Sequence, residues 1–242
     1  MSNLVAEVME NAVFIVEFLG VVAGLFIVAY VFEKMEKRKQ GSRERVLTTR
    51  KIAMIGVFSA IASILMLFEV PVPFAPPFYG IDLSEVPVLI GTFAFGPVAG
   101  VMMEFVKILL KVCFKPTSTA FVGELANFAV GCSFLLPASV VYLFRKNKKT
   151  AIISCVVGTL SMTIFGTLFN AVYLLPKFAQ LYGMPLDTII AMGTAVNPAI
   201  DSVTALVVLA VAPLNLLKGF LISLITILTY KKLSPIIKSS HK

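Results

Sequence analysis

This chain of 242 residues contains a single histidine and no glycine-lysine pair. The only histidine, His241, lies in the C-terminal tail, which excludes a histidine-based metal site and a Ser-His catalytic pair. No glycine is followed directly by lysine, so a phosphate-binding loop of the Gly-x-x-x-x-Gly-Lys type is also excluded. We therefore expect no metal site and no catalytic residue, and any ATP must be hydrolysed by a partner chain.

Cysteine is also rare, and its three copies lie in separate apolar segments without Cys-x-x-Cys spacing. This pattern favours small hydrophobic core residues over metal ligands or disulfide partners. The three residues are Cys113, Cys132 and Cys155.

Charged residues make up only 14% of the chain, whereas 58% is hydrophobic and the mean hydropathy is +0.94. Such a composition leaves too little polar surface to cover a water-soluble core, and it indicates a protein that crosses the lipid bilayer several times. The net charge of +8 comes from short basic runs between apolar blocks rather than from one basic face. Nucleic acid is therefore not an expected partner.

Six apolar blocks predict membrane helices, because about 20 apolar residues are needed to cross a bilayer. The blocks are 12–32, 52–70, 86–114, 120–144, 151–175 and 199–230. The longer block 86–114 contains Gly96-Pro97, a pair that interrupts helices. We therefore expect an all-α integral membrane protein.

Lysine and arginine are unevenly distributed between these blocks. Of the 21, eight lie in 34–51, four in 145–149 and four from Lys231 onward. The positive-inside bias places all three stretches in the cytoplasm. The cation-poor segments are then outside, and they are 69–85, 115–119 and 176–198. This arrangement requires 86–114 to cross twice, with a cytoplasmic turn at Gly96-Pro97 and a short first helix that other helices shield.

The charge pattern thus divides the chain into four parts. Residues 1–33 are expected to form an N-terminal transmembrane helix that begins outside, and 34–51 a basic cytoplasmic linker. Residues 52–230 would form a six-helix membrane domain, and 231–242 a basic cytoplasmic tail.

Polar side chains inside the apolar blocks are candidates for function, because an unpaired amide or ammonium in hydrocarbon costs several kcal/mol. Such residues either pair with each other or bind a ligand. They are Asn215 and Lys218, Glu124 and Asn127, Asn170 alone, and Glu104 with Lys107 and Lys111. The last three share one helix at i, i+3 and i+7, which favours a structural ion pair.

Six short motifs follow one another in an order that resembles a known family. They are Tyr79-Gly-Ile-Asp-Leu-Ser-Glu-Val-Pro87, Phe95-Gly-Pro-Val-Ala-Gly100, Glu104-Phe-Val-Lys107, Lys115-Pro-Thr-Ser-Thr-Ala120, Gly123-Glu-Leu-Ala-Asn127 and Asn215-Leu-Leu-Lys218. From about Lys51 to the C-terminus, the chain resembles the riboflavin-specific substrate-binding (S) components of energy-coupling factor (ECF) transporters, the RibU family.

The resemblance implies a six-helix membrane bundle that captures riboflavin from outside, as a transported ligand rather than a cofactor. It also implies two kinds of partner: a membrane coupling subunit (EcfT-like) and two cytoplasmic ATPase subunits. The helix at 12–32 is additional to the six-helix pattern, so the resemblance says nothing of its role.

The resemblance also implies which residues contact the ligand. The candidates are Asn215, Lys218, Asn170, Glu124, Asn127, Phe78 and Tyr79. An asparagine amide offers a donor and an acceptor side by side, which matches the carbonyl and N–H edge of an isoalloxazine ring. Phe78 and Tyr79 lie in the loop 71–85, which could cover the ring from outside. The alternatives are interhelical hydrogen bonds or ion pairs for the polar residues and an interfacial anchor for the loop.

Small residues on the first family helix suggest where the coupling subunit docks. Family members often carry Ala-x-x-x-Ala there, because small residues let a second helix approach closely. The nearest equivalents are Gly56-x-x-x-Ala60 and Ser59-x-x-x-Ser63. Packing inside the bundle explains the same residues equally well.

Two other classes of function remain open at this point. Within the same architecture, the ligand could be another vitamin or a flavin nucleotide such as FMN. Outside it, the chain could be a membrane enzyme or an adapter without ligand. A bound flavin would colour the purified protein yellow, whereas an adapter would be colourless.

Overall fold

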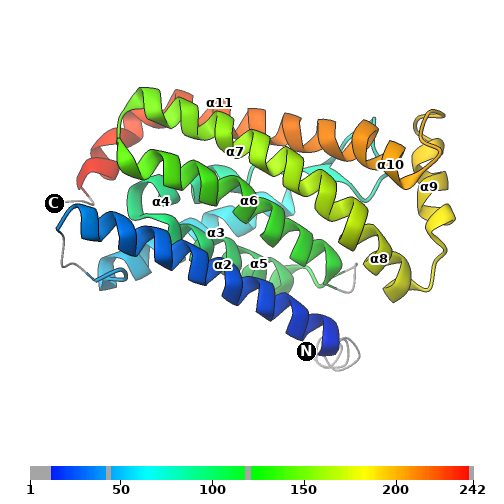
Figure 1. The fold of residues 1–242 in the computed structure, drawn as a ribbon, viewed down its shortest axis with the longest axis horizontal. Helices are drawn as coiled ribbons and strands as arrows, with labels where there is room; N and C mark the ends of the chain where they lie inside the picture. Colours follow the sequence, from blue (N-terminus) through cyan, green and yellow to red (C-terminus); the bar gives the residue numbers. More distant parts are fainter. Residues whose placement is uncertain (1–11, 42–44, 118–120, 240–242) are drawn as a thin grey trace.

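The computed structural model describes residues 12–41, 45–117 and 121–239, which form an elongated bundle of helices (Figure 1). The long helices are α2 (Ala12–Lys39), α3 (Thr49–Leu67), α5 (Pro97–Phe114), α6 (Val122–Phe144), α7 (Lys148–Phe169) and α11 (Ala212–Ser239). The shorter elements are α4 (Glu85–Phe95), α8 (Leu175–Tyr182), α9 (Leu186–Thr194), α10 (Val203–Leu206) and two π-helical turns, η1 (Asn170–Leu174) and η2 (Val207–Val211). Strands β1 (Val70–Pro71) and β2 (Gly80–Ile81) pair antiparallel in the loop between α3 and α4.

Five helical spans within the described residues are long and apolar enough to cross a membrane. They are Phe14–Lys39, Thr49–Leu67, Val122–Phe144, Lys148–Tyr182 and Val203–Thr229. The prediction of an all-α membrane protein is confirmed. The exact number of crossings stays a prediction, because α4 has only 11 residues and α5 carries three charged residues in its interior.

The break at Gly96-Pro97 separates α4 from α5, as the sequence predicts. Gly96 has φ of +98°, a backbone conformation that favours glycine, and Pro97 begins α5 where a helix needs no N–H donor. Nine residues of α4 are buried, from Glu85 to Phe95. The short helix is therefore shielded by α3, α5, α6 and α11, which pack around it.

Basic residues gather at one end of the bundle. The C-terminal end of α2, the turn between α6 and α7 and the C-terminal end of α11 lie together there (Figure 1). The loop between α3 and α4 and helices α8 and α9 lie at the opposite end (Figure 1). The segment 176–198, expected as an outside loop, thus contains most of α8 and the whole of α9.

Two prolines explain the two π-helical turns. Pro176 and Pro213 each follow a turn after one intervening residue, Leu175 or Ala212. A proline lacks an N–H and its ring clashes with the carbonyl four residues earlier, which here belongs to Val172 or Leu209 in the middle of a π-turn. Widening the helix at that point accommodates the ring without ending the helix.

Candidate functional site

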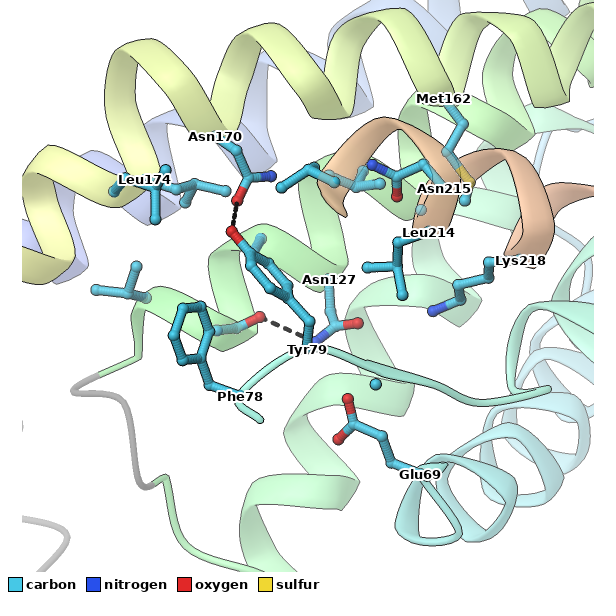
Figure 2. A pocket seen from close by; sticks show the side chains of 18 of the residues that line it. Glu69, Phe78, Tyr79, Asn127, Met162, Asn170, Leu174, Leu214, Asn215 and Lys218 are labelled. Carbon is cyan, nitrogen blue, oxygen red and sulfur yellow. Dashed lines mark hydrogen bonds between the residues drawn. The ribbon is translucent and has the colours of Figure 1, made fainter. Parts of the chain in front are cut away.

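A cavity of about 140 Å³ opens near the end of the bundle opposite the basic residues. Its walls come from α6, from the α7–η1–α8 segment, from the start of α11 and from the loop between α3 and α4 (Figure 2). Apolar side chains form most of the wall, and the polar ones are Glu69, Tyr79, Glu85, Asn127, Asn170, Asn215 and Lys218. The sequence candidates Asn215, Lys218, Asn170, Asn127, Phe78 and Tyr79 therefore lie around one pocket, and Glu124 does not.

Asn170 holds the loop against α7. Its amide nitrogen donates to the Gly166 carbonyl at 2.8 Å, and its amide oxygen accepts from the Tyr79 hydroxyl at 2.8 Å (Figure 2). Burial raises the pKa of Tyr79, so the hydroxyl keeps its proton and remains a donor. The contact joins the loop to the α7–η1 wall of the pocket.

Asn215 is buried, with 5% of its surface exposed, and its side chain reaches the pocket wall. Within the described parts of the chain, the amide has no hydrogen-bond partner. Glycine at position 166 makes room for it, since a Cβ there would lie 2.6 Å from the Asn215 Nδ2 atom. Because the side chain lines the cavity, a ligand there can make hydrogen bonds with both the donor and the acceptor of the amide.

Lys218 is held by two carboxylates from the loop and from α4. Its Nζ donates to Asp82 Oδ2 at 2.9 Å and lies 3.9 Å from Glu85 Oε1. Burial would raise the pKa of Asp82, but the charges of Lys218 and Lys107, together with hydrogen bonds from Ser84 and Lys218, lower that pKa to about 2. The lowered pKa makes the ion pair stabilising above the ordinary value of 3.8, and this is lost only as the pH falls toward about 2. The pair therefore persists at neutral pH.

Three aromatic rings line one side of the pocket. The Phe78 ring lies 4.6 Å from the Tyr79 ring and 5.8 Å from the stacked Phe178 ring of α8, measured between centroids. Flat ligands are held well by such rings, because offset or tilted aromatic contacts add to the burial of apolar area.

Glu124 lies outside the pocket lining, and among the alternatives left open by the sequence it forms an ion pair with another helix. Its carboxylate contacts Lys111 Nζ at 2.6 Å and accepts from the Thr117 hydroxyl at 2.9 Å. The Asn127 amide donates instead to the Gly123 carbonyl at 3.0 Å, one helical turn back (Figure 2). Asn127 still lines the cavity.

The charged residues of α5 are structural, but they divide differently from the expected trio. Lys107 is fully buried and contacts Glu104 at 2.5 Å and Glu85 of α4 at 2.9 Å. Lys111 instead reaches α6 through Glu124. Of the two carboxylates around Lys107, Glu85 also lines the cavity, so this buried cluster adjoins the pocket.

The four small residues of α3 face two directions. Ser59 and Ser63 are buried, and their hydroxyls donate to the carbonyls of Met103 and Ala60. They therefore cannot present a docking surface as expected. Gly56 and Ala60 are exposed, and the space beside Gly56 is open.

Several pocket residues are absent from the sequence-based candidates. They are Glu69, Glu85, Met162 and Phe178, and Asp82 joins them as the partner of the pocket residue Lys218. Asp82 and Glu85 lie in the motif that begins at Tyr79, but only their approach to Lys218 at 2.9 and 3.9 Å shows their role.

Partial removal from solvent and the nearby Asp82 charge raise the pKa of Glu69. No cluster that could hold a metal is present in the part of the chain that the structure describes.

Residues 50–230 match the family of ECF transporter substrate-specific components. This chain belongs to that family. It is 36% identical to riboflavin transporter RibU of Staphylococcus aureus (strain TCH60) over 189 residues, or 78% of this chain and 93% of the relative. It is 31% identical to riboflavin transporter FmnP of Bacillus subtilis (strain 168) over 196 residues, or 81% of this chain and 97% of the relative.

A solved structure gives the same result. The S component of a bacterial ECF transporter shares 35% identity with this chain and superposes with a TM-score of 0.61, covering 78% of this chain and 98% of that one. The S component described here is thus the substrate-binding membrane subunit of an ECF vitamin importer, not an enzyme, and a multi-pass membrane protein.

Proposed function

We propose that this S component binds riboflavin in the pocket between α6, α7 and α11 and presents it for import. The unpartnered amide of Asn215 in an apolar, aromatic-lined cavity carries the proposal. An isoalloxazine ring is flat and mostly apolar, and its polar edge matches the donor and acceptor of an asparagine amide. The relatives named above are riboflavin transporters, which favours the same vitamin here.

The charges of the pocket favour riboflavin over a flavin nucleotide. Two carboxylates, Glu69 and Glu85, line the cavity, and the Lys218 ammonium is already paired with Asp82. Ribityl hydroxyls can donate hydrogen bonds to carboxylates, whereas the phosphate dianion of FMN would be repelled by them. Riboflavin is the ligand in this proposal, and no cofactor is involved.

Direct titration tests the proposal. The purified chain in detergent is titrated into riboflavin, FMN, thiamine and biotin, with riboflavin fluorescence quenching and calorimetry as readouts. We expect saturable one-to-one binding of riboflavin and weaker binding of FMN. Saturable binding of thiamine or biotin without binding of riboflavin would overturn the assignment.

The motor is proposed to be supplied by other chains: a membrane coupling subunit (EcfT-like) and two cytoplasmic ATPase subunits. No phosphate-binding loop of the Gly-x-x-x-x-Gly-Lys type occurs in the sequence. Alone, the chain should bind riboflavin without concentrating it in liposomes.

Gly56 and Ala60 are proposed to contact the coupling subunit, since they leave an exposed, shallow strip on α3. Gly56→Leu should lower ATP-driven riboflavin uptake by the assembled transporter at least about tenfold, because a side chain would fill the strip that a second helix must approach. Riboflavin affinity of the isolated chain should not change, since nothing lies within 4 Å of the added Cβ.

Gly20→Leu is the matched control, because Gly20 of α2 also faces open space. It should leave uptake unchanged. Equal loss of uptake in both variants would exclude the α3 strip as the specific contact.

The orientation of the chain is also a proposal, with the N-terminus outside and the C-terminus in the cytoplasm. The basic ends of α2, α6 and α11 lie together, at the end of the bundle opposite α8 and α9 (Figure 1), and the positive-inside bias favours the cytoplasm for them. In a cysteine-free background, single cysteines at Ser2 or Gln180 should react with an impermeant thiol reagent in intact cells. Cysteines at Asn147 or Ser239 should react only after permeabilisation, and labelling of Asn147 in intact cells would contradict this orientation.

A further inference from the structure

Helix α2 lies outside the region that the family covers, yet it is fixed to the bundle. The family match begins at residue 50, whereas α2 ends at Lys39. The helix packs on α5 and α6, and Val22 and Ala29 are buried against Val101 and Phe128 there. Three of its glutamates make ion pairs with other parts of the chain.

The contact nearest the pocket is made by Glu17. Its carboxylate accepts a hydrogen bond from the Tyr173 hydroxyl and lies 3.2 Å from Lys177 Nζ. The same ammonium lies 5.5 Å from the centroid of the Phe14 ring, which is buried. The Glu17 side chain is 42% exposed, and its carboxylate is nevertheless held by two side chains of the segment 170–182.

Both partners of Glu17 belong to the segment that forms one wall of the pocket. Tyr173 lies in the π-helical turn η1, whose first residue is Asn170, and Lys177 lies in α8 beside Phe178. Asn170, Leu174 and Phe178 all line the cavity. At η1 the chain departs from the regular α-helical hydrogen-bond pattern, so contacts with neighbouring helices bear on its position.

We propose that Glu17 of α2 is a positioning residue for the ligand pocket. Through its contacts with Tyr173 and Lys177, Glu17 fixes the position of the η1–α8 wall. It thereby also fixes the orientation of the Asn170 amide. This inference rests on the proposed function, namely that the pocket binds riboflavin. It assigns to the added helix a part in ligand affinity, beyond simple cover for α5 and α6.

The opposite end of α2 supplies a matched control. Glu36 is buried and lies 3.6 Å from Lys146 Nζ in the turn between α6 and α7. That turn lies at the end of the bundle opposite α8 (Figure 1). Glu17→Ala and Glu36→Ala each remove one carboxylate that ties α2 to the bundle. Only the first touches the pocket wall.

The test measures riboflavin affinity and thermal stability of the full-length chain in detergent. Glu17→Ala should weaken riboflavin binding about threefold to tenfold, the effect of one or two lost hydrogen bonds. Tyr173→Phe should weaken it similarly, and Glu17→Gln, which keeps an acceptor for the hydroxyl, should recover part of the affinity. Glu36→Ala should lower thermal stability and leave affinity unchanged.

A double-mutant cycle separates positioning from general stability. If Glu17 acts through Asn170, then Glu17→Ala added to Asn170→Ala should cause no further loss of affinity. Additive losses, or an unchanged affinity in Glu17→Ala, would overturn the inference. Failure of the proposed function looks different, since the unmodified chain itself would then not bind riboflavin.

Discussion

Replacing Lys107 by methionine is expected to lower the free energy of unfolding by about 3–5 kcal/mol. Lys107 is fully buried, and its ammonium is the shared partner of Glu85 and Glu104. Methionine preserves much of the apolar stem but leaves two buried carboxylates without their cation, which is the costly way to break an ion pair. Denaturant unfolding in mixed micelles measures the change.

Lys111→Met provides the comparison on the same helix. The Lys111 side chain keeps 18% of its surface exposed, so its pair with Glu124 is partly solvated and should contribute less than about 1 kcal/mol. Adding Glu104→Gln to Lys107→Met should restore part of the lost stability by removing one stranded charge. If Lys107→Met is no more damaging than Lys111→Met, the buried cluster does not stabilise the fold in this way.

Asn215→Ala is expected to weaken riboflavin binding by about 1–3 kcal/mol, or roughly 5- to 150-fold in the dissociation constant. The amide is buried beside the cavity and has no partner among the described residues, so a ligand gains its full hydrogen bonds. Asn170→Ala should act in the same direction, with an added effect from the released Tyr79 hydroxyl. Titration calorimetry measures both variants.

Two lysine variants complete this test. Lys218→Met removes the partner of Asp82, so we expect it to lower both riboflavin affinity and the thermal stability of the empty protein. Lys111→Met should leave affinity unchanged. If Lys111→Met weakens binding more than Asn215→Ala and Lys218→Met, then the pocket does not hold the ligand.

Local sequence signals predict the helices and several pocket residues well. Long apolar blocks become helices because few other structures satisfy the backbone in lipid, and Gly96-Pro97 interrupts one block where a positive φ is required. Asn170, Asn215 and Lys218 stand out because polar groups are rare in such helices. The pocket that they share lies where the ends of α7 and α11 meet the loop.

Pairings between distant segments could not be predicted in the same way. Asp82 meets Lys218 across 136 positions of sequence, and no local pattern identifies that partner. Ser59 and Ser63 turn inward because α3 packs on α5. The sequence could not predict this, because the spacing of small residues is the same on either face of a helix. Glu124 pairs with Lys111 for a similar reason. The packing of α5 on α6 determines this contact, and the sequence around Glu124 does not reveal it.

The turn η2 also determines the angular phase of the helix that follows it. A π-turn inserts one residue into an otherwise α-helical path, which rotates everything downstream by about 100° about the helix axis. Asn215 and Lys218 lie less than two helical turns after η2. The direction in which their side chains point therefore depends on that inserted residue. A purely α-helical path through 207–211 would aim both side chains away from the cavity. Which side chains line the pocket is therefore determined partly by a π-turn that contains none of the polar pocket residues of α11.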